Sequence, residues 1–137
     1  MKKIFLFTFF LISIQSFCQI SYPQNLTFHT RDESASYIDQ NGNKKYEEVS
    51  NKKGNYQVQI TKAAEIKNSP IIDIFGDNNQ KGYYVFVSTL NNIKMNGKLY
   101  EGSHFFSTGL NTGVNIYLSF DKTSLIIEFK NKVIWYY

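Results

Sequence analysis

The two histidines are the residues of this chain best suited to chemistry, because an imidazole can serve as general acid, general base or metal ligand. His29 lies near Asp32 and Glu33, and a carboxylate beside an imidazole can orient a general base or complete a metal shell. No second histidine stands at ligand spacing, and a polar segment of this kind is typically solvated. We therefore expect neither a metal nor a cofactor at His29.

His104 stands between Ser103 and Ser107, and either serine could be drawn as a nucleophile beside an imidazole base. A small secreted hydrolase that uses His104 or His29 is therefore one alternative function. The strained elbow motif that presents a hydrolase serine is absent, however, and adjacency in sequence does not show that two side chains meet. We expect no catalytic residue here and favour a protein that is not an enzyme.

Two segments rich in Asp and Asn, 39–43 and 77–79, resemble fragments of calcium-binding loops. In the first, Lys44 stands where such a loop needs its glycine, and Ser50 stands where it needs a bidentate glutamate. Turn chemistry accounts for both segments, so we expect no metal site in either.

Pairs of consecutive aromatic residues, here called doublets, indicate a binding surface more strongly than the histidines or the Asp- and Asn-rich segments do. Successive residues of a strand point to opposite faces, so a doublet cannot hide both rings against one core face. The segments 83–87 and 133–137 are apolar on both faces, whereas the strands between them are one-sided. The doublets are Tyr83-Tyr84, Phe105-Phe106 and Tyr136-Tyr137.

Two interpretations of the doubly apolar segments remain open. In the structural one, loops or the N-terminal region cover both faces of these strands in a closed barrel or sandwich. In the functional one, Tyr83, Tyr84, Trp135 and Tyr136 form an aromatic surface that binds an extended glycan, a lipid-like small molecule or another protein. A third function, pairing of protein chains through a free C-terminal edge strand at 133–137, would make the protein an oligomer.

Composition predicts an all-β fold. After residue 18, Val and Ile number eighteen and the aromatic residues another eighteen, while Ala, Leu and Met reach only ten. Branched and aromatic side chains suit a pleated, half-buried surface. Period-2 patterns mark strands at 56–61, 114–120 and 125–129, and short Asn- and Gly-rich turns separate the runs. We predict an antiparallel meander of six or seven strands over 56–137, forming a small barrel or sandwich.

The segment 21–55 allows two predictions. Thr30 to Glu33 has the form of a capping box, which indicates a short helix near residues 31–40. A hairpin that turns at Asn41-Gly42, with Tyr37 and Tyr46 on its arms, explains the same residues equally well.

The N-terminus has the pattern of a cleaved bacterial signal peptide. Lys2 and Lys3 precede an uncharged run at 4–14, and small residues allow a cut between Cys18 and Gln19. The run is too short to span a bilayer, and the bulky Phe17 argues against a lipoprotein acylated at Cys18. We expect segment 1–18 to be removed and 19–137 to form one domain in the periplasm or outside the cell.

The chain without residues 1–18 is expected to be nearly neutral, and this limits the classes of partner that its charge could attract. Loss of Lys2 and Lys3 leaves 13 basic and 11 acidic residues, a net charge of 13 − 11 = +2. This excess is too small to indicate nucleic acid as a partner. The only cysteine, Cys18, lies in the segment expected to be lost, so packing alone must stabilise the domain.

Overall fold

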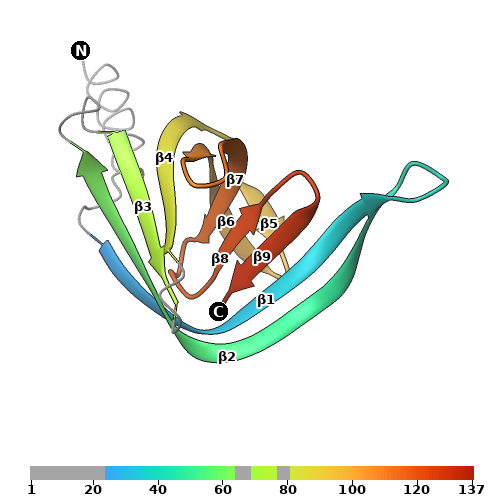
Figure 1. Ribbon diagram of the computed structural model, residues 1–137, viewed down its shortest axis with the longest axis horizontal. Coiled ribbons are helices and arrows are strands. Elements are labelled where there is room, and N and C mark those ends of the chain that lie inside the picture. Colours follow the sequence, from blue (N-terminus) through green and yellow to red (C-terminus); the bar gives the residue numbers. More distant parts are fainter. Residues whose placement is uncertain (1–23, 64–68, 77–80) are drawn as a thin grey trace, which may run out of the picture.

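The computed structural model describes residues 24–63, 69–76 and 81–137. Within these ranges every regular element is a strand (Figure 1). The described residues contain no helical segment that could span a membrane. The expected signal peptide with Cys18, and the segment 77–79, lie outside the described residues. The strands are β1 (Gln24–Ile38), β2 (Lys44–Ala63), β3 (Ser69–Phe75), β4 (Lys81–Thr89), β5 (Ile93–Met95), β6 (Lys98–Ser107), β7 (Thr112–Ser119), β8 (Leu125–Glu128) and β9 (Lys132–Tyr136).

The strands form one antiparallel sheet that closes on itself. Its order is β4-β3-β2-β1-β9-β8-β7-β6-β5, and β4 also pairs with β6. Eight strands therefore complete a ring of hydrogen bonds, while the short β5 pairs with the start of β6, next to the segment that pairs with β4. The predicted all-β antiparallel fold is confirmed, and its form is a small barrel.

Closure of the ring removes the predicted free edge at the C-terminus. β9 lies between β1 and β8 and pairs with both. Beyond β9, the amides of His29 and Thr30 donate to the carbonyl of Tyr137 at 3.0 and 2.8 Å. The expectation that segment 133–137 offers an unpaired edge to another chain is wrong, because β1 already occupies that edge.

The prediction of a short helix near residues 31–40 is also wrong, and the alternative hairpin is confirmed. β1 and β2 form a long hairpin whose end projects beyond the barrel (Figure 1). At its turn, Asp39 Oδ1 accepts hydrogen bonds from the amides of Asn41 and Asn43 at 2.9 and 2.8 Å, and Gly42 adopts φ +80°. Residues 31–35 instead pair with β2 on one side and β9 on the other. Two ladders of backbone hydrogen bonds outweigh a capping signal that has few apolar residues behind it.

The barrel interior is the hydrophobic core. In β7, Val114, Ile116 and Leu118 point inward, as the period-2 pattern predicts, whereas Phe120 lies beyond the strand and is exposed. Leu125, Ile127 and Phe129 likewise reach the core, as the pattern of segment 125–129 predicts. The most deeply buried side chains of the core include Phe28, Val58, Val114, Leu125 and Ile127. At roughly 25 cal/mol per Å² of apolar surface, such burial is the main source of stability for a domain without disulfides.

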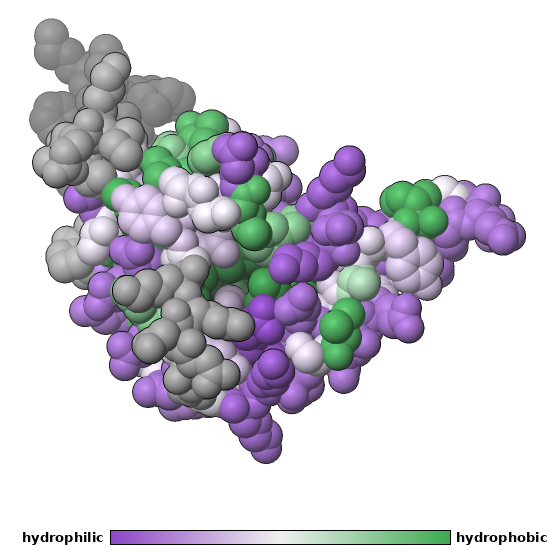
Figure 2. All heavy atoms as spheres, viewed as in Figure 1, coloured by the Kyte–Doolittle hydropathy of each residue, from purple (hydrophilic) through white to green (hydrophobic). Residues whose placement is uncertain are grey.

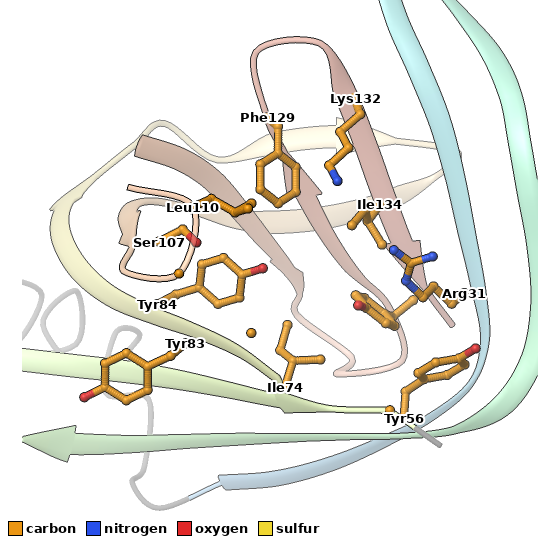
Figure 3. Close-up of a pocket in the computed structure, with 14 residues that line it drawn as sticks. Arg31, Tyr56, Ile74, Tyr83, Tyr84, Ser107, Leu110, Phe129, Lys132 and Ile134 are labelled. Atoms are coloured by element: carbon orange, nitrogen blue, oxygen red, sulfur yellow. The ribbon is translucent and has the colours of Figure 1, made fainter. Parts of the chain in front are cut away.

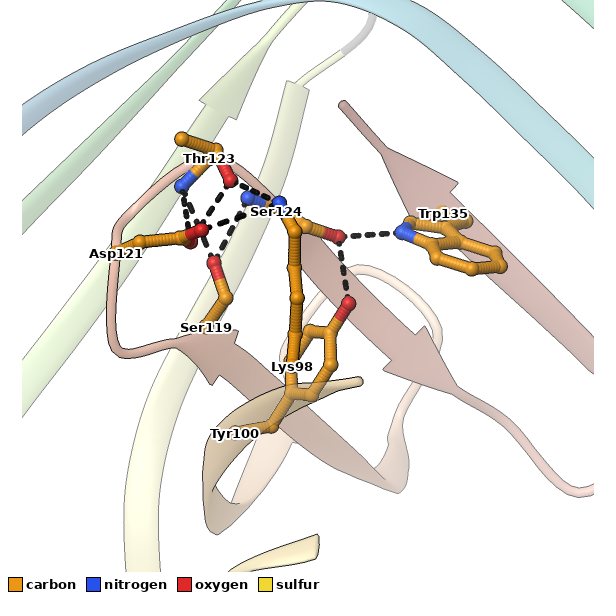
Figure 4. Close-up of polar contacts among 7 residues, drawn as sticks. All are labelled: Lys98, Tyr100, Ser119, Asp121, Thr123, Ser124 and Trp135. Carbon is orange, nitrogen blue, oxygen red and sulfur yellow. Dashed lines mark hydrogen bonds and ion pairs between the residues drawn. The ribbon is translucent and has the colours of Figure 1, made fainter. Parts of the chain in front are cut away.

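A polar cluster joins the start of β6, the turn that precedes β8 and the end of β9 (Figure 4). Ser124 Oγ accepts hydrogen bonds from the Tyr100 hydroxyl at 3.2 Å and from the Trp135 indole N–H. Ser119 Oγ in turn accepts from the backbone amides of Thr123 and Ser124 at 3.1 and 2.9 Å. These bonds hold the turn between β7 and β8 against the sheet and fix the orientation of Trp135.

Candidate binding pocket

Strand alternation separates the rings of each aromatic doublet, as the sequence predicts. Tyr84, Phe105 and Tyr136 are buried in the barrel, whereas their neighbours Tyr83, Phe106 and Tyr137 remain 39%, 39% and 45% exposed. The four residues expected to form one aromatic surface are therefore divided. Tyr83, Tyr84 and Tyr136 line a pocket in the barrel, while Trp135 lines a groove on its outer side.

The pocket lies in the barrel between β1, β4 and β9 and has a volume of about 390 Å³. Figure 3 shows Tyr84, Phe129 and Ile74 pointing into this space and the ring of Tyr83 pointing away from it. A space-filling view shows hydrophobic residues at the bottom of a hollow whose surroundings are more hydrophilic (Figure 2). The apolar and aromatic residues that line the pocket are Tyr56, Ile74, Tyr83, Tyr84, Leu110, Phe129, Ile134 and Tyr136.

A β-bulge in β1 turns Arg31 into this pocket. The amides of His29 and Thr30 both donate to the carbonyl of Tyr137, so two residues of β1 face a single residue, which is the arrangement of a β-bulge. The register between β1 and β2 also shifts here, with Gly54 and Asn55 of β2 opposite His29 alone. An extra residue reverses which side chains face inward, and bulges commonly re-aim a side chain in this way. Phe28 faces the core before the bulge, and Arg31 and Glu33 face inward after it, opposite the inward-facing Tyr136 and Ile134.

Two cations share a single carboxylate at this pocket. The Arg31 guanidinium lies 2.7 Å from one oxygen of Glu33, and Lys132 Nζ lies 3.8 Å from the other. Burial disfavours the charge on Arg31, but hydrogen bonds to Glu33 and Tyr136 outweigh it and raise the guanidinium pKa. Lys132 Nζ also lies 4.9 Å from the centre of the Phe129 ring. One positive charge is therefore left without a matching carboxylate in this group.

The hydroxyls of Tyr84 and Tyr136 stay protonated at neutral pH. Burial, with a smaller contribution from Tyr136, raises the pKa of Tyr84 to about 12. Burial also raises the pKa of Tyr136, although its hydrogen bond with Arg31 opposes the change. Neutral hydroxyls can donate hydrogen bonds, so the pocket combines two cations with polar donors on an apolar wall.

The geometry does not assemble the serine and histidine of a hydrolase. Ser103 and Ser107 lie on the same side of β6 as the inward-facing Phe105, whereas His104 lies on the opposite side. His104 Nδ1 is 2.9 Å from Asn115 Oδ1, and its ring packs over Gly113, where an added Cβ would approach the ring within 2.8 Å. The serines are therefore on the wrong face of the strand to meet the imidazole.

His29 is likewise separated from a catalytic or metal-binding arrangement. It is the exposed bulge residue, and the two carboxylates near it in sequence point to opposite faces of β1. Asp32 accepts hydrogen bonds from Asn51 and the Tyr137 hydroxyl, while Glu33 holds Arg31. Over 24–63, 69–76 and 81–137, no group of three His, Cys, Asp or Glu side chains could hold a metal ion.

Comparison of the chain with models of protein families, with curated proteins and with solved structures finds no match. The function therefore has to be argued from the pocket itself. Sequence reasoning identified Tyr83, Tyr84 and Tyr136 but missed Arg31 and Lys132. Lys132 stands two residues before Ile134 on the same face, so the alternation of β9 could have found it. The inward position of Arg31 depends on a bulge that has no clear sequence signal.

Proposed function

We propose that this protein binds a small amphipathic anion, such as the carboxylate form of a lipid-like molecule, in the pocket of its barrel. The observation that carries the proposal is the convergence of Arg31 and Lys132 on a cavity whose other lining side chains are apolar or tyrosine except for Ser107. Of the glycan, lipid-like and protein ligands expected from the sequence, we favour the lipid-like one. Tyr84 and Tyr136 are part of the proposed binding site.

The shape of the site supports a small ligand. An eight-stranded barrel is just wide enough to be filled by its side chains or to hold one small ligand, and barrel mouths are common ligand sites. A cavity of about 390 Å³ lies within the size range of such sites. Phe129, Leu110 and Ile74 would contact the apolar part of the ligand and exclude water from it.

The charges support an anionic head group. Arg31 presents a planar fork of N–H donors that suits a carboxylate, and Glu33 and Tyr136 hold it in place. Lys132 supplies a second positive charge that shares Glu33 with Arg31. An anion that binds between the two cations would neutralise the unmatched charge, whereas a neutral glycan would leave it unchanged.

Calorimetric titration of the mature protein with octanoate tests the proposal, with octanol as the neutral analogue. We expect octanoate to bind with at least about tenfold higher affinity than octanol, because its head group makes charge-assisted hydrogen bonds. Lys132→Met should weaken octanoate binding about five- to tenfold, and the exposed Lys130→Met is its matched control in the same hairpin.

Arg31 needs two variants because its removal leaves Glu33 without its closest partner. Arg31→Met should abolish binding, and Arg31→Lys should retain part of it, since lysine keeps the charge but loses the fork. Circular dichroism of each variant checks that the barrel is intact. Equal affinity for octanoate and octanol, or equal effects of the Lys132 and Lys130 variants, would contradict the proposed function.

A further inference from the structure

A second cavity, on the outer side of the barrel, has a different chemistry. This outer groove has a volume of about 570 Å³ and is bounded by side chains from six strands: β1, β2, β5, β7, β8 and β9. The projecting hairpin of β1 and β2 contributes Tyr46 and Glu48, and β5 contributes Ile93 and Met95 (Figure 1). It is separate from the barrel pocket and shares no lining residue with it.

Strand register builds an aromatic floor in this groove. Asp32, Trp135, Ile126 and Tyr117 are successive partners across β1, β9, β8 and β7, so their side chains lie in one row on the outer face. The ring of Tyr117 packs over Gly102, where an added Cβ would lie 2.9 Å from the ring. The hydrogen bond to Ser124 fixes the indole of Trp135. The floor therefore consists of oriented rings that are ready to stack on a ligand.

The charges around this floor are negative. Among the described residues that line the groove, Asp32, Glu48 and Glu128 carry carboxylates, and none carries a cation. Burial alone would raise the pKa of Glu128, but hydrogen bonds from Lys44 and Asn115 lower it, so this carboxylate is charged at neutral pH. A groove with aromatic rings and carboxylates attracts a cation through both the ring faces and the charges.

The chain itself places an ammonium group at the edge of this groove. Lys44 bonds to Glu128 through its Nζ, which also lies 5.7 Å from the centre of the Tyr46 ring. Both of these partners line the groove. Lys44 is therefore an internal example of an ammonium ion bound between a carboxylate and an aromatic ring, and it competes with any external cation for Glu128.

We propose that the outer groove binds a small organic ammonium ion with an apolar body. The apolar part would lie on Trp135, Ile126 and Tyr117, and the charge would face Glu128 and Glu48. This site would act independently of the anion pocket in the barrel, because the two lie on opposite sides of the barrel wall.

Fluorescence titration with benzyltrimethylammonium tests the proposal directly. Trp135 is the only tryptophan of the chain, so its emission reports on this groove alone. We expect a saturable change with benzyltrimethylammonium and none with benzenesulfonate, which has a similar size but the opposite charge. Glu128→Gln should weaken binding about tenfold, because the ammonium loses its nearest carboxylate.

Substitution of Lys44 should have the opposite effect on ammonium binding to substitution of Glu128. Lys44→Gln should strengthen binding about three- to tenfold, because it frees Glu128 from its internal partner. Lys45→Gln is the matched control, since Lys45 precedes Tyr46 on the other face of β2 and pairs with Asp39. Unfolding curves verify that each variant is folded.

Three results would overturn this proposal: no saturable change with the ammonium probe, an equal response to benzenesulfonate, or weaker binding by the Lys44 variant. Each of these outcomes concerns the outer groove only. Octanoate binding in the barrel should be unchanged by the Lys44 and Glu128 variants, so failure here is distinguishable from failure of the proposed anion site.

Discussion

Replacement of Ser124 by alanine should destabilise the barrel far more than the loss of one small hydroxyl suggests. Ser124 is 2% exposed, and its oxygen accepts hydrogen bonds from Tyr100 and Trp135 (Figure 4). Tyr100 is completely buried, so water cannot replace the lost acceptor at its hydroxyl. The variant would therefore leave a buried donor without its partner.

The size of the effect follows from these burials. A buried polar group left without a partner costs about 1–3 kcal/mol. The indole N–H of the half-buried Trp135 is nearer to solvent and adds less than about 1 kcal/mol. We expect Ser124→Ala to lower the free energy of unfolding by about 2–3 kcal/mol. The exposed Ser88→Ala should change it by less than about 0.5 kcal/mol.

Urea unfolding followed by circular dichroism measures this loss, and a double-mutant cycle identifies its cause. In Ser124→Ala combined with Tyr100→Phe, the stranded hydroxyl is gone, so the double variant should be more stable than the sum of the single losses predicts. The expected coupling is about 1 kcal/mol. A loss below about 0.5 kcal/mol for Ser124→Ala, or strictly additive losses, would refute the reasoning.

Further predictions concern packing, pH and processing. Gly102→Ala should cost about 1–3 kcal/mol in urea unfolding because its Cβ would lie 2.9 Å from a backbone oxygen and from an aromatic ring, whereas Gly109→Ala, which meets no atom within 4 Å, should be nearly neutral. The lowered pKa of Glu128 stabilises the fold above the ordinary value of 4.5 and ceases to do so as pH falls through the folded value, so Glu128→Gln should flatten the acid side of the stability profile. The raised pKa of Tyr84 stabilises the fold below pH 10 and this contribution disappears as pH rises to about 12, so Tyr84→Phe should flatten the alkaline side. Mass spectrometry of protein exported from a bacterial host should find Gln19 as the first residue, and an intact Met1 would contradict the expected cleavage.

Local sequence patterns predicted the strands well because alternation is a property of the extended chain itself. The patterns at 114–120 and 125–129 correspond to β7 and β8, and the split between Tyr83 and Tyr84 follows from the same rule. The segment 31–40 was harder to assign, since a capping signal and a hairpin turn compete there on local grounds. In the structure, residues 30–38 pair with β2, and residues 31–35 pair also with β9, more than ninety residues away in the chain, so both sets of hydrogen bonds favour the hairpin.

Local sequence patterns predict most of the strand-forming segments and turns, and they predict that neighbouring aromatic side chains lie on opposite faces. The three-dimensional fold establishes which of these faces meet. Closure of β4 on β6 and of β9 on β1 turned the inner face into a core and a pocket, and the bulge at His29 directed Arg31 into it. The physical reason is the distance along the chain over which each interaction acts. Side-chain alternation depends on adjacent peptide units. Barrel closure and the register across a bulge depend on hydrogen bonds between residues that are distant in the chain.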